Sequence, residues 1–353
     1  MNPLSVGIIG LQHLHPRSYM PLFKAVEETE VVCVAESDVQ LCDAFTDDFG
    51  VRGYSSWKAM LEKESLDLAA IFLPHVDCPD AAVACAEKGI HLLIEKPIAA
   101  NRAGAEKIVA AAEKTGVKLS VPYVWRYHPV AREMKSLIDR QVLGRIVGCE
   151  GRCAAGKVQR YIDGHARWML EKAKSGGGPM YNLGVHWIDL FRWFLNDEVA
   201  EVLARNVKVN TQYNIEDNSF ALLTFRNGAV LALDISYTVP DSYPCGRDLY
   251  LGLRGTEGVL SWSPSFEGVK ETLFLCSDAS DFSDSPRRHL QFELESAPGY
   301  CGTLGVHFIR DIARCILEDL PVPITGKDAI EALRVVEAVY TAAETGTAVH
   351  IHG

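Results

Sequence analysis

Two polar residues in the middle of the chain, an asparagine and a histidine, have the spacing of one helical face. Asn182 and His186 lie four residues apart in the stretch GGGPMYNLGVHWIDLFRWFL. Residues four apart on an α-helix share one face, and an imidazole can accept or return a proton near neutral pH. Because apolar and aromatic residues surround it, His186 can equally be a packed core histidine. The spacing alone leaves both interpretations open.

A second candidate site is the loop after the apolar run Val6–Ile9. Gly10 follows this run as in a dinucleotide-binding loop, but Gln12 and His15 replace the next two glycines of that fingerprint. His13 and His15 are two apart, as metal ligands on a strand can be, yet the loop offers no third ligand. We therefore expect an altered pyrophosphate loop with donors from helix amides, Gln12 or His13, and no metal site.

Charged residues end two other apolar runs. Glu36 follows Gly10 at close to the interval of about 20 residues expected for a carboxylate that binds the adenosine ribose, with Asp38 as a nearby competitor. A carboxylate there repels a 2′-phosphate, which favours NAD over NADP. Lys96 precedes Pro97, which restricts it to extended backbone and directs its side chain to the cleft expected between two domains.

The elements that position these residues fall into two domains. Over residues 1–122, short apolar runs alternate with amphipathic stretches, which predicts an α/β domain with a parallel sheet covered on both faces. Ligands of such sheets lie beyond the carboxyl ends of the strands. That edge carries Gly10, Glu36, Leu73–His75, Glu95–Pro97 and Tyr123–Arg126.

Residues 123–353 have longer, alternating strand patterns, and RNG at 226–228 is typical of a hairpin turn. We expect an α+β domain with a large, mostly antiparallel sheet, one face of which forms a homodimer or homotetramer. The stretch YIDGHARWML (161–170) mixes aromatic and polar residues, as sugar sites do. It can also be an ordinary surface loop.

Composition limits the class of protein. The 353 residues are 48% hydrophobic and carry a net charge of −11, which argues against binding to nucleic acid or to an anionic membrane. The ten cysteines form no CxxC pair, so we expect reduced thiols in a cytoplasmic protein without a secretory signal.

Four stretches together resemble one family: EKP at 95–97, WRYHP at 125–129, the glycine loop and helix at 176–193, and the closing VPITGKDAIEALRVVEAVYTAAETG. The chain resembles the Gfo/Idh/MocA oxidoreductases, which include inositol and sugar dehydrogenases. The resemblance implies an α/β N-terminal Rossmann domain and a C-terminal α+β domain with an open-faced sheet. It also implies bound NAD(P) and hydride transfer at a secondary hydroxyl or ketone of a sugar, cyclitol or related polyol.

The resemblance also implies roles for single residues. Lys96 would polarise the reacting oxygen and His186 would be the proton acceptor, while Asn182 stands where the family has aspartate and would position both. The cofactor-binding residues expected are Gly10, Gln12, His13, His15, Glu36, Leu73, Pro74, His75, Cys78, Glu95, Lys96, Trp125 and Arg126. The substrate-binding residues expected are Lys96, Tyr123, Arg126, Tyr161, His165, Arg167, Trp168, Asn182 and His186.

Two alternatives remain on the same fold. The altered loop and Asn182 are compatible with a dinucleotide-binding sensor that has lost catalysis. The family also includes NAD-dependent glycosidases, in which transient oxidation of the sugar permits elimination. We take the dehydrogenase as the primary hypothesis because Lys96 and His186 are both retained.

Overall fold

The computed structural model describes residues 2–240, 242–265 and 269–352. The chain divides into two compact units. The first contains Met1–Val124, Gln159–Gly176 and Ser296–Glu331, and the second contains Trp125–Val158, Gly177–Glu295 and Ala332–Gly353. The sequence analysis expects a single domain boundary between residues 122 and 123. In the structure, two segments that follow this boundary belong to the first unit.

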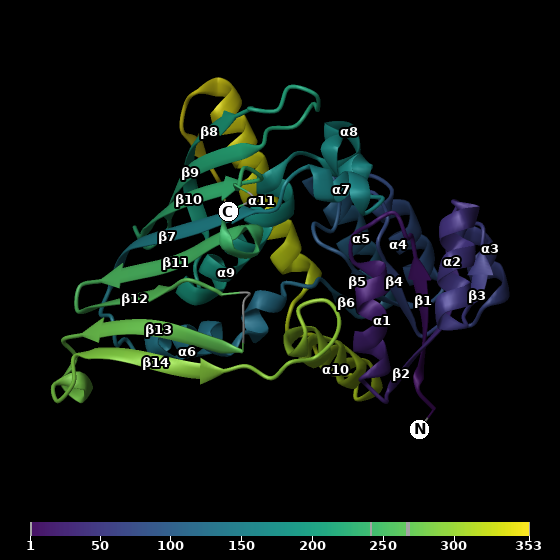
Figure 1. Cartoon of the computed structure of the whole chain (residues 1–353), viewed down its shortest axis with the longest axis horizontal. Helices are drawn as coiled ribbons and strands as arrows, with labels where there is room; N and C mark the ends of the chain where they lie inside the picture. The colour runs from purple at the N-terminus through teal and green to yellow at the C-terminus, as the bar shows by residue number, and fades with distance from the viewer. Residues whose placement is uncertain (1, 241, 266–268, 353) are drawn as a thin grey trace. The chain divides into compact units, whose positions relative to one another are not determined.

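The first unit contains a six-stranded parallel sheet in the order β3-β2-β1-β4-β5-β6 (Figure 1). Its strands are β1 (Leu4–Ile9), β2 (Thr29–Ala35), β3 (Arg52–Tyr54), β4 (Leu68–Ile71), β5 (His91–Ile94) and β6 (Leu119–Ser120). Its helices are α1 (Pro16–Lys24), α2 (Val39–Phe49), α3 (Trp57–Lys63), α4 (Cys78–Glu87) and α5 (Arg102–Thr115). The expected Rossmann architecture is confirmed.

Local sequence explains where these helices begin. Asp38 and Ser56 cap α2 and α3 with side-chain oxygens that accept backbone N–H groups. The first helix begins at Pro16, because proline is well suited to the first turn, where its missing N–H would have no partner.

Two segments from later in the chain complete the first unit. Gln159–Gly176 holds α7 (Gln159–Asp163), a 3₁₀ turn (Arg167–Leu170) and α8 (Lys172–Ser175), while Ser296–Glu331 holds α10 (Thr303–Leu317). The stretch 161–170 was expected within the second domain; it packs instead on the β1–α1 loop, where Trp168 Nε1 donates to the carbonyl of Gln12 at 2.5 Å.

The second unit contains a nine-stranded sheet in the order β14-β13-β12-β11-β7-β10-β9-β8-β15 (Figure 1). Its strands are β7 (Ile146–Ala155), β8 (Val199–Val207), β9 (Asn218–Phe225), β10 (Val230–Ser236), β11 (Arg247–Gly255), β12 (Gly258–Trp262), β13 (Lys270–Ser277), β14 (Arg287–Glu293) and β15 (Val349–His350). Only the β10–β7 pairing among these strands is parallel, so the mostly antiparallel sheet is confirmed. The expected RNG hairpin joins β9 to β10, and Gly228 N–H donates to Phe225 O at 2.9 Å.

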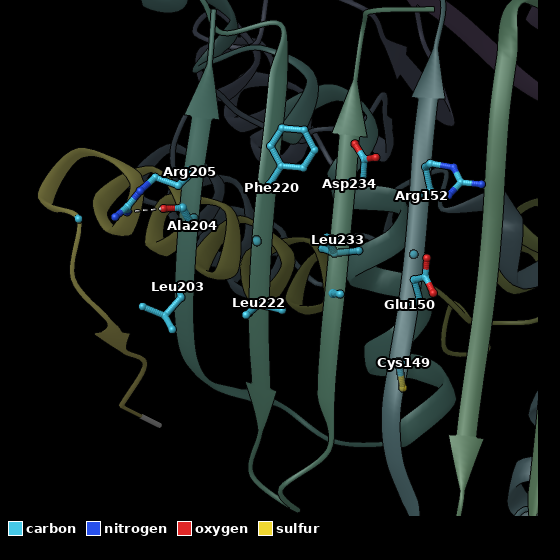
Figure 2. Close-up of a pocket in the computed structure, with 14 residues that line it drawn as sticks. Cys149, Glu150, Arg152, Leu203, Ala204, Arg205, Phe220, Leu222, Leu233 and Asp234 are labelled. Carbon is cyan, nitrogen blue, oxygen red and sulfur yellow. Dashed lines mark hydrogen bonds between the residues drawn. The ribbon is translucent and has the colours of Figure 1, made fainter.

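Helices cover one face of this sheet. They include α6 (Pro129–Asp139), α9 (Val185–Leu195) and the later part of α11 (Gly326–Thr345). Figure 2 views the opposite face, where a cavity of about 670 Å³ lies over β7, β8, β9 and β10. The side chains of Leu203, Phe220 and Leu222 are 42%, 42% and 48% exposed there. This face therefore presents apolar side chains that no helix of the unit covers.

Candidate active site

The cofactor side of the site is built on the edge of the first unit where β1, β2 and β4 end. A cavity of about 480 Å³ lies there, lined by five of the expected residues: Gly10, Gln12, Glu36, Leu73 and Pro74. Gly10 has a φ of 90°, and an added Cβ would lie 3.1 Å from backbone atoms of Phe72 and Leu73. Glycine is therefore required at this turn.

Glu36 forms a wall of this cavity and is only 4% exposed. Its carboxylate accepts Leu11 N–H at 2.6 Å, Gln12 Nε2 at 3.0 Å and Asp38 N–H at 2.9 Å. It also accepts the hydroxyl of Ser37 at 3.1 Å. The altered loop is thus organised by the carboxylate that was expected to meet the ribose.

The cavity includes residues that the sequence analysis did not name for the cofactor. They are Ala35, Ser37, Ser55, Ser56, Trp57, Phe72, Asp77, Asp80, Trp168 and Lys174. Asp77 and Asp80 lie at the start of α4, the helix that follows β4, and could have been found from that position. Trp168 and Lys174 could not, because only tertiary packing brings the segment 159–176 to this edge. The cavity has apolar walls and the carboxylates of Glu36, Asp77 and Asp80, and this lining fits the adenosine half of a dinucleotide.

A cluster of buried polar residues lies beside this loop in the first unit. Glu95 and Lys96, which follow β5, are each 3% exposed. His15 Nδ1 lies 3.3 Å from Glu95 Oε2, and the hydroxyl of Tyr19 donates to the same oxygen at 3.3 Å. Burial lowers the pKa of His13 well below its usual value, and the charge of His15 lowers it further. His13 therefore faces this cluster as a neutral imidazole.

His13, His15 and Glu95 each offer a ligand atom, and the three atoms lie within 4.8 Å of one another. The loop itself provides no third ligand, as expected, but Glu95 from the end of β5 does. His15 N–H donates to His13 Nδ1 at 3.2 Å, so the neutral His13 ring carries its proton on Nε2. Nε2 then presents an N–H donor rather than the lone pair that a metal requires.

Two expected cofactor residues have structural contacts in the first unit. His75 Nδ1–H donates to Ser175 O at 2.7 Å, and burial lowers the pKa of His75 to about 4. The thiol of Cys78, at the start of α4, donates to the carbonyls of Leu73 and Pro74, and burial raises its pKa. Both residues tie the β4–α4 loop to its neighbours, and neither lines the cavity.

The catalytic candidates of the second unit lie on one continuous helical segment. Met180–Gly184 forms a π-helical turn and Val185–Leu195 continues as α9, so the expected helix is present with a wider first turn. Asn182 is 5% and His186 6% exposed. Asn182 Nδ2 donates to the hydroxyl of Tyr237 at 3.0 Å. Tyr237 was missed by the sequence analysis, since it lies far along the chain, directly after the end of β10.

Trp125 and Arg126 make contacts within the second unit. Arg126 holds the Asp189 carboxylate through two hydrogen bonds, with Nε at 2.9 Å and Nη2 at 2.5 Å. Trp125 packs against the rings of Trp187 and Trp262 at 5.2 and 5.9 Å. These contacts join the segment before α6 to α9 and to the sheet, so they support a structural role.

The remaining expected substrate residues all belong to the first unit. Tyr161 and Tyr123 are buried, whereas His165 and Arg167 are exposed. Trp168 is buried against His75, with ring centroids 4.7 Å apart. The stretch 161–170 therefore divides into an inner part that packs on the nucleotide-binding loop and an outer part that faces solvent.

Comparison with known proteins agrees with this architecture. The family model described as "Oxidoreductase family, NAD-binding Rossmann fold" matches residues 4–123, and "Oxidoreductase family, C-terminal alpha/beta domain" matches residues 135–351. The two models carry the names GFO_IDH_MocA and GFO_IDH_MocA_C.

Single relatives cover almost the whole chain. A D-xylose 1-dehydrogenase (NADP(+)) from Haloferax volcanii is 25% identical and covers 98% of this chain and 99% of its own. A D-apiose dehydrogenase from Paraburkholderia graminis is 24% identical over 99% of this chain and 88% of its own. An Agrobacterium radiobacter oxidoreductase, solved with NAD+, L-tartaric acid and magnesium, is 20% identical over 98% of both chains, with a TM-score of 0.85.

Proposed function

Because the chain belongs to the Gfo/Idh/MocA family of NAD(P)-binding oxidoreductases, we propose that it oxidises or reduces a secondary alcohol of a sugar, cyclitol or related polyol. The observation that carries the proposal is the buried turn that presents Asn182 and His186 at the start of α9. The same chain has a cavity at the strand ends of its Rossmann sheet. The relatives named as D-xylose and D-apiose dehydrogenases support the substrate class.

In this function His186 is the general base for oxidation and the general acid for reduction. A neutral imidazole accepts the hydroxyl proton as the C–H hydrogen leaves as hydride. The ammonium of Lys96 stabilises the negative charge that develops on the substrate oxygen. Asn182 supplies a hydrogen-bonding amide without charge, and Tyr237 fixes that amide. The nicotinamide of the bound cofactor supplies the hydride acceptor.

We propose that NAD is preferred to NADP. The cavity wall is acidic at the end of β2, where Glu36 accepts four hydrogen bonds from its own unit. Asp38 follows it and caps α2. A 2′-phosphate beside these carboxylates would be repelled, whereas ribose hydroxyls can donate to Glu36. The Haloferax relative carries NADP(+) in its name, so this preference is a property to test in the present chain.

We also propose that the open face of the nine-stranded sheet associates with a second copy of the chain. Phe220 and Leu222 on β9 and Leu203 on β8 give this face exposed apolar area (Figure 2). Charged residues of both signs line the same cavity: Glu150, Arg152, Arg205 and Asp234. A face with both signs of charge can be self-complementary about a two-fold axis. Sedimentation velocity of wild type and Phe220→Glu tests this, and a wild-type monomer contradicts it.

The catalytic proposal is tested by incubating the protein with NAD and a panel of aldoses, polyols, cyclitols and glycosides. Net NADH formation with an aldose or polyol supports the dehydrogenase. Release of the aglycone without net NADH would identify a glycosidase, and cofactor binding without turnover would identify a sensor. The same panel is tested with NADP, because an enzyme that uses only NADP would show no activity with NAD.

A further inference from the structure

Glu216 is a buried carboxylate placed against the start of the turn that carries Asn182. It lies in the loop before β9 and is 8% exposed. Gly178 N–H donates to Glu216 Oε2 at 3.2 Å and to the hydroxyl of Tyr340 at 2.9 Å. The Tyr340 hydroxyl in turn donates to Glu216 Oε1, and Met180 N–H donates to the same carboxylate. Two segments distant in sequence therefore meet on this backbone.

The glycine run of the sequence is explained by these contacts. A Cβ added to Gly178 would overlap the carbonyl oxygen of Glu216, and one added to Gly177 would overlap the hydroxyl of Tyr340. Neither obstruction can move freely, because the carbonyl of Glu216 is part of the backbone and the Tyr340 hydroxyl is held by hydrogen bonds to Gly178 and Glu216. The two glycines thus allow Glu216 and Tyr340 to lie directly on the chain at the entrance to the turn.

The same contacts continue to the candidate proton-transfer residues. Gly178 O accepts Asn182 N–H at 3.2 Å, and the Asn182 amide donates to the Tyr237 hydroxyl. Tyr237 N–H donates to the carbonyl of Asp217 at 2.8 Å, and Asp217 is the neighbour of Glu216. The dipeptide Glu216–Asp217 is therefore linked to the turn at Gly178 directly and at Asn182 through Tyr237. His186 follows at the beginning of α9.

Burying a carboxylate at this position has a cost in desolvation free energy. Burial raises the pKa of Glu216, and the hydrogen bonds from Tyr340 and from backbone amides oppose that rise. Burial raises the pKa of the neighbouring Tyr181, and the charges of Glu337 and Glu216 raise it further. The negative charge is favourable beside the N–H groups that open a helical segment. A purely structural contact could be made by an apolar side chain without this desolvation cost.

We propose that Glu216 and Tyr340 are positioning residues, which fix the backbone at Gly177–Met180 and thereby the orientation of Asn182 and His186. This inference rests on the proposed function, in which His186 moves the proton. Neither residue is expected to touch substrate or cofactor. Both act through the peptide of Gly178 and the π-helical turn that follows it.

The test uses the full chain and the variants Glu216→Gln and Tyr340→Phe, with Glu271→Gln as the matched control. Glu271 is also a buried carboxylate of the second unit, accepting Trp262 Nε1 and Ser265 N–H at 2.9 Å each, and burial raises its pKa. It lies on β13, away from the glycine run. The glutamine variants keep size while removing charge, and Tyr340→Phe removes one hydroxyl.

The readout is the imidazole ¹⁵N NMR signal of His186, assigned by its loss in His186→Gln, with thermal melts for stability. Glu216→Gln and Tyr340→Phe are expected to shift this signal and its titration midpoint, and Glu271→Gln is expected to leave both unchanged. If the signal is the same in all three variants, or moves equally in the control, the positioning role is wrong. If Glu216→Gln does not fold, Tyr340→Phe by itself still tests the positioning role.

Binding and turnover separate this inference from the proposed function. NAD affinity measured by calorimetry should be unchanged in both variants, because they alter only the second unit. With an aldose or polyol that the wild type turns over, kcat should fall by roughly ten- to a hundredfold, the effect of a misplaced catalytic group. A wild type without turnover on any compound would count against the proposed function, while the NMR result would still test the positioning of His186.

Discussion

Two loops of this protein are each organised by a nearly buried glutamate, but the two carboxylates have different surroundings. Glu36 in the first unit accepts hydrogen bonds from the β1–α1 loop and the start of α2, and it borders a cavity. Glu216 in the second unit is closed off by Tyr340 and the glycine run. The comparison indicates that the first carboxylate is placed to meet a ligand and the second to hold the protein's own chain.

The largest expected loss of activity follows from removing His186, which the second loop presents, or Lys96, its proposed partner in catalysis. His186→Ala and Lys96→Ala should each reduce turnover on the order of a hundredfold or more, as loss of a proton-transfer or charge-stabilising group does. Steady-state kinetics with an identified substrate measures this, and His289→Ala on β14 is the control. Wild-type rates in both variants would place the active site elsewhere.

Asn182→Asp probes the uncharged amide beside the base. The substitution is nearly isosteric and adds a negative charge next to the Tyr237 hydroxyl. A nearby opposite charge favours the protonated imidazole. The apparent pKa of the acidic limb in the pH–rate profile for oxidation should therefore rise by a fraction of a unit to about two units. Profiles of wild type and variant at identical salt make the comparison. An unmoved limb would show that residue 182 is not electrostatically coupled to the base.

The ligand-facing character of Glu36 predicts cofactor choice. NAD should bind at least about tenfold more tightly than NADP, which corresponds to about 1.4 kcal/mol. Glu36→Gln should narrow the ratio, because the amide no longer repels a 2′-phosphate. Calorimetric titration of both cofactors provides the measurement, and Glu216→Gln is the control in which the ratio should persist. Equal affinities in the wild type would remove Glu36 from this role.

Buried His75 predicts an acid sensitivity of the first unit. Its folded pKa is about 4, lowered mainly by burial, and its unfolded pKa is near 6.5, so the unfolded chain binds more protons between these values. Stability should therefore be lost as pH falls through this window, by up to about 1.4 kcal/mol per pH unit. The amide of His75→Asn can still donate to Ser175 O. In this variant the free energy of unfolding, measured with urea, should depend less steeply on pH than in the wild type. An equal slope would contradict the assignment.

The smallest effect is expected at the His13–His15–Glu95 cluster. Protein purified without a histidine tag should contain less than one equivalent of transition metal, because His13 presents an N–H donor to the cluster. Elemental analysis of wild type and His15→Ala is the measurement. A full equivalent in the wild type that disappears in His15→Ala would overturn this prediction.

Short-range physics made much of the first unit predictable. Apolar runs followed by Gly10 and Glu36 identified strand ends, and capping residues and Pro16 set helix starts. In the second unit the RNG turn located the hairpin between β9 and β10. Arg126 shows the limit of motif reasoning, since its guanidinium is held by Asp189.

The sequence by itself determined the two-part architecture, the family, the nucleotide-binding edge and the identity of Lys96, Asn182 and His186 as candidates. These follow from periodicity, turn chemistry and motif spacing, which are local properties of the chain. Only the tertiary structure decided which distant residues meet: Trp168 on the Gln12 carbonyl, Glu95 beside His15, and Tyr340 on the backbone of Gly178. Buried polar groups must find partners, and long-range packing, rather than sequence spacing, selects which partners are within reach.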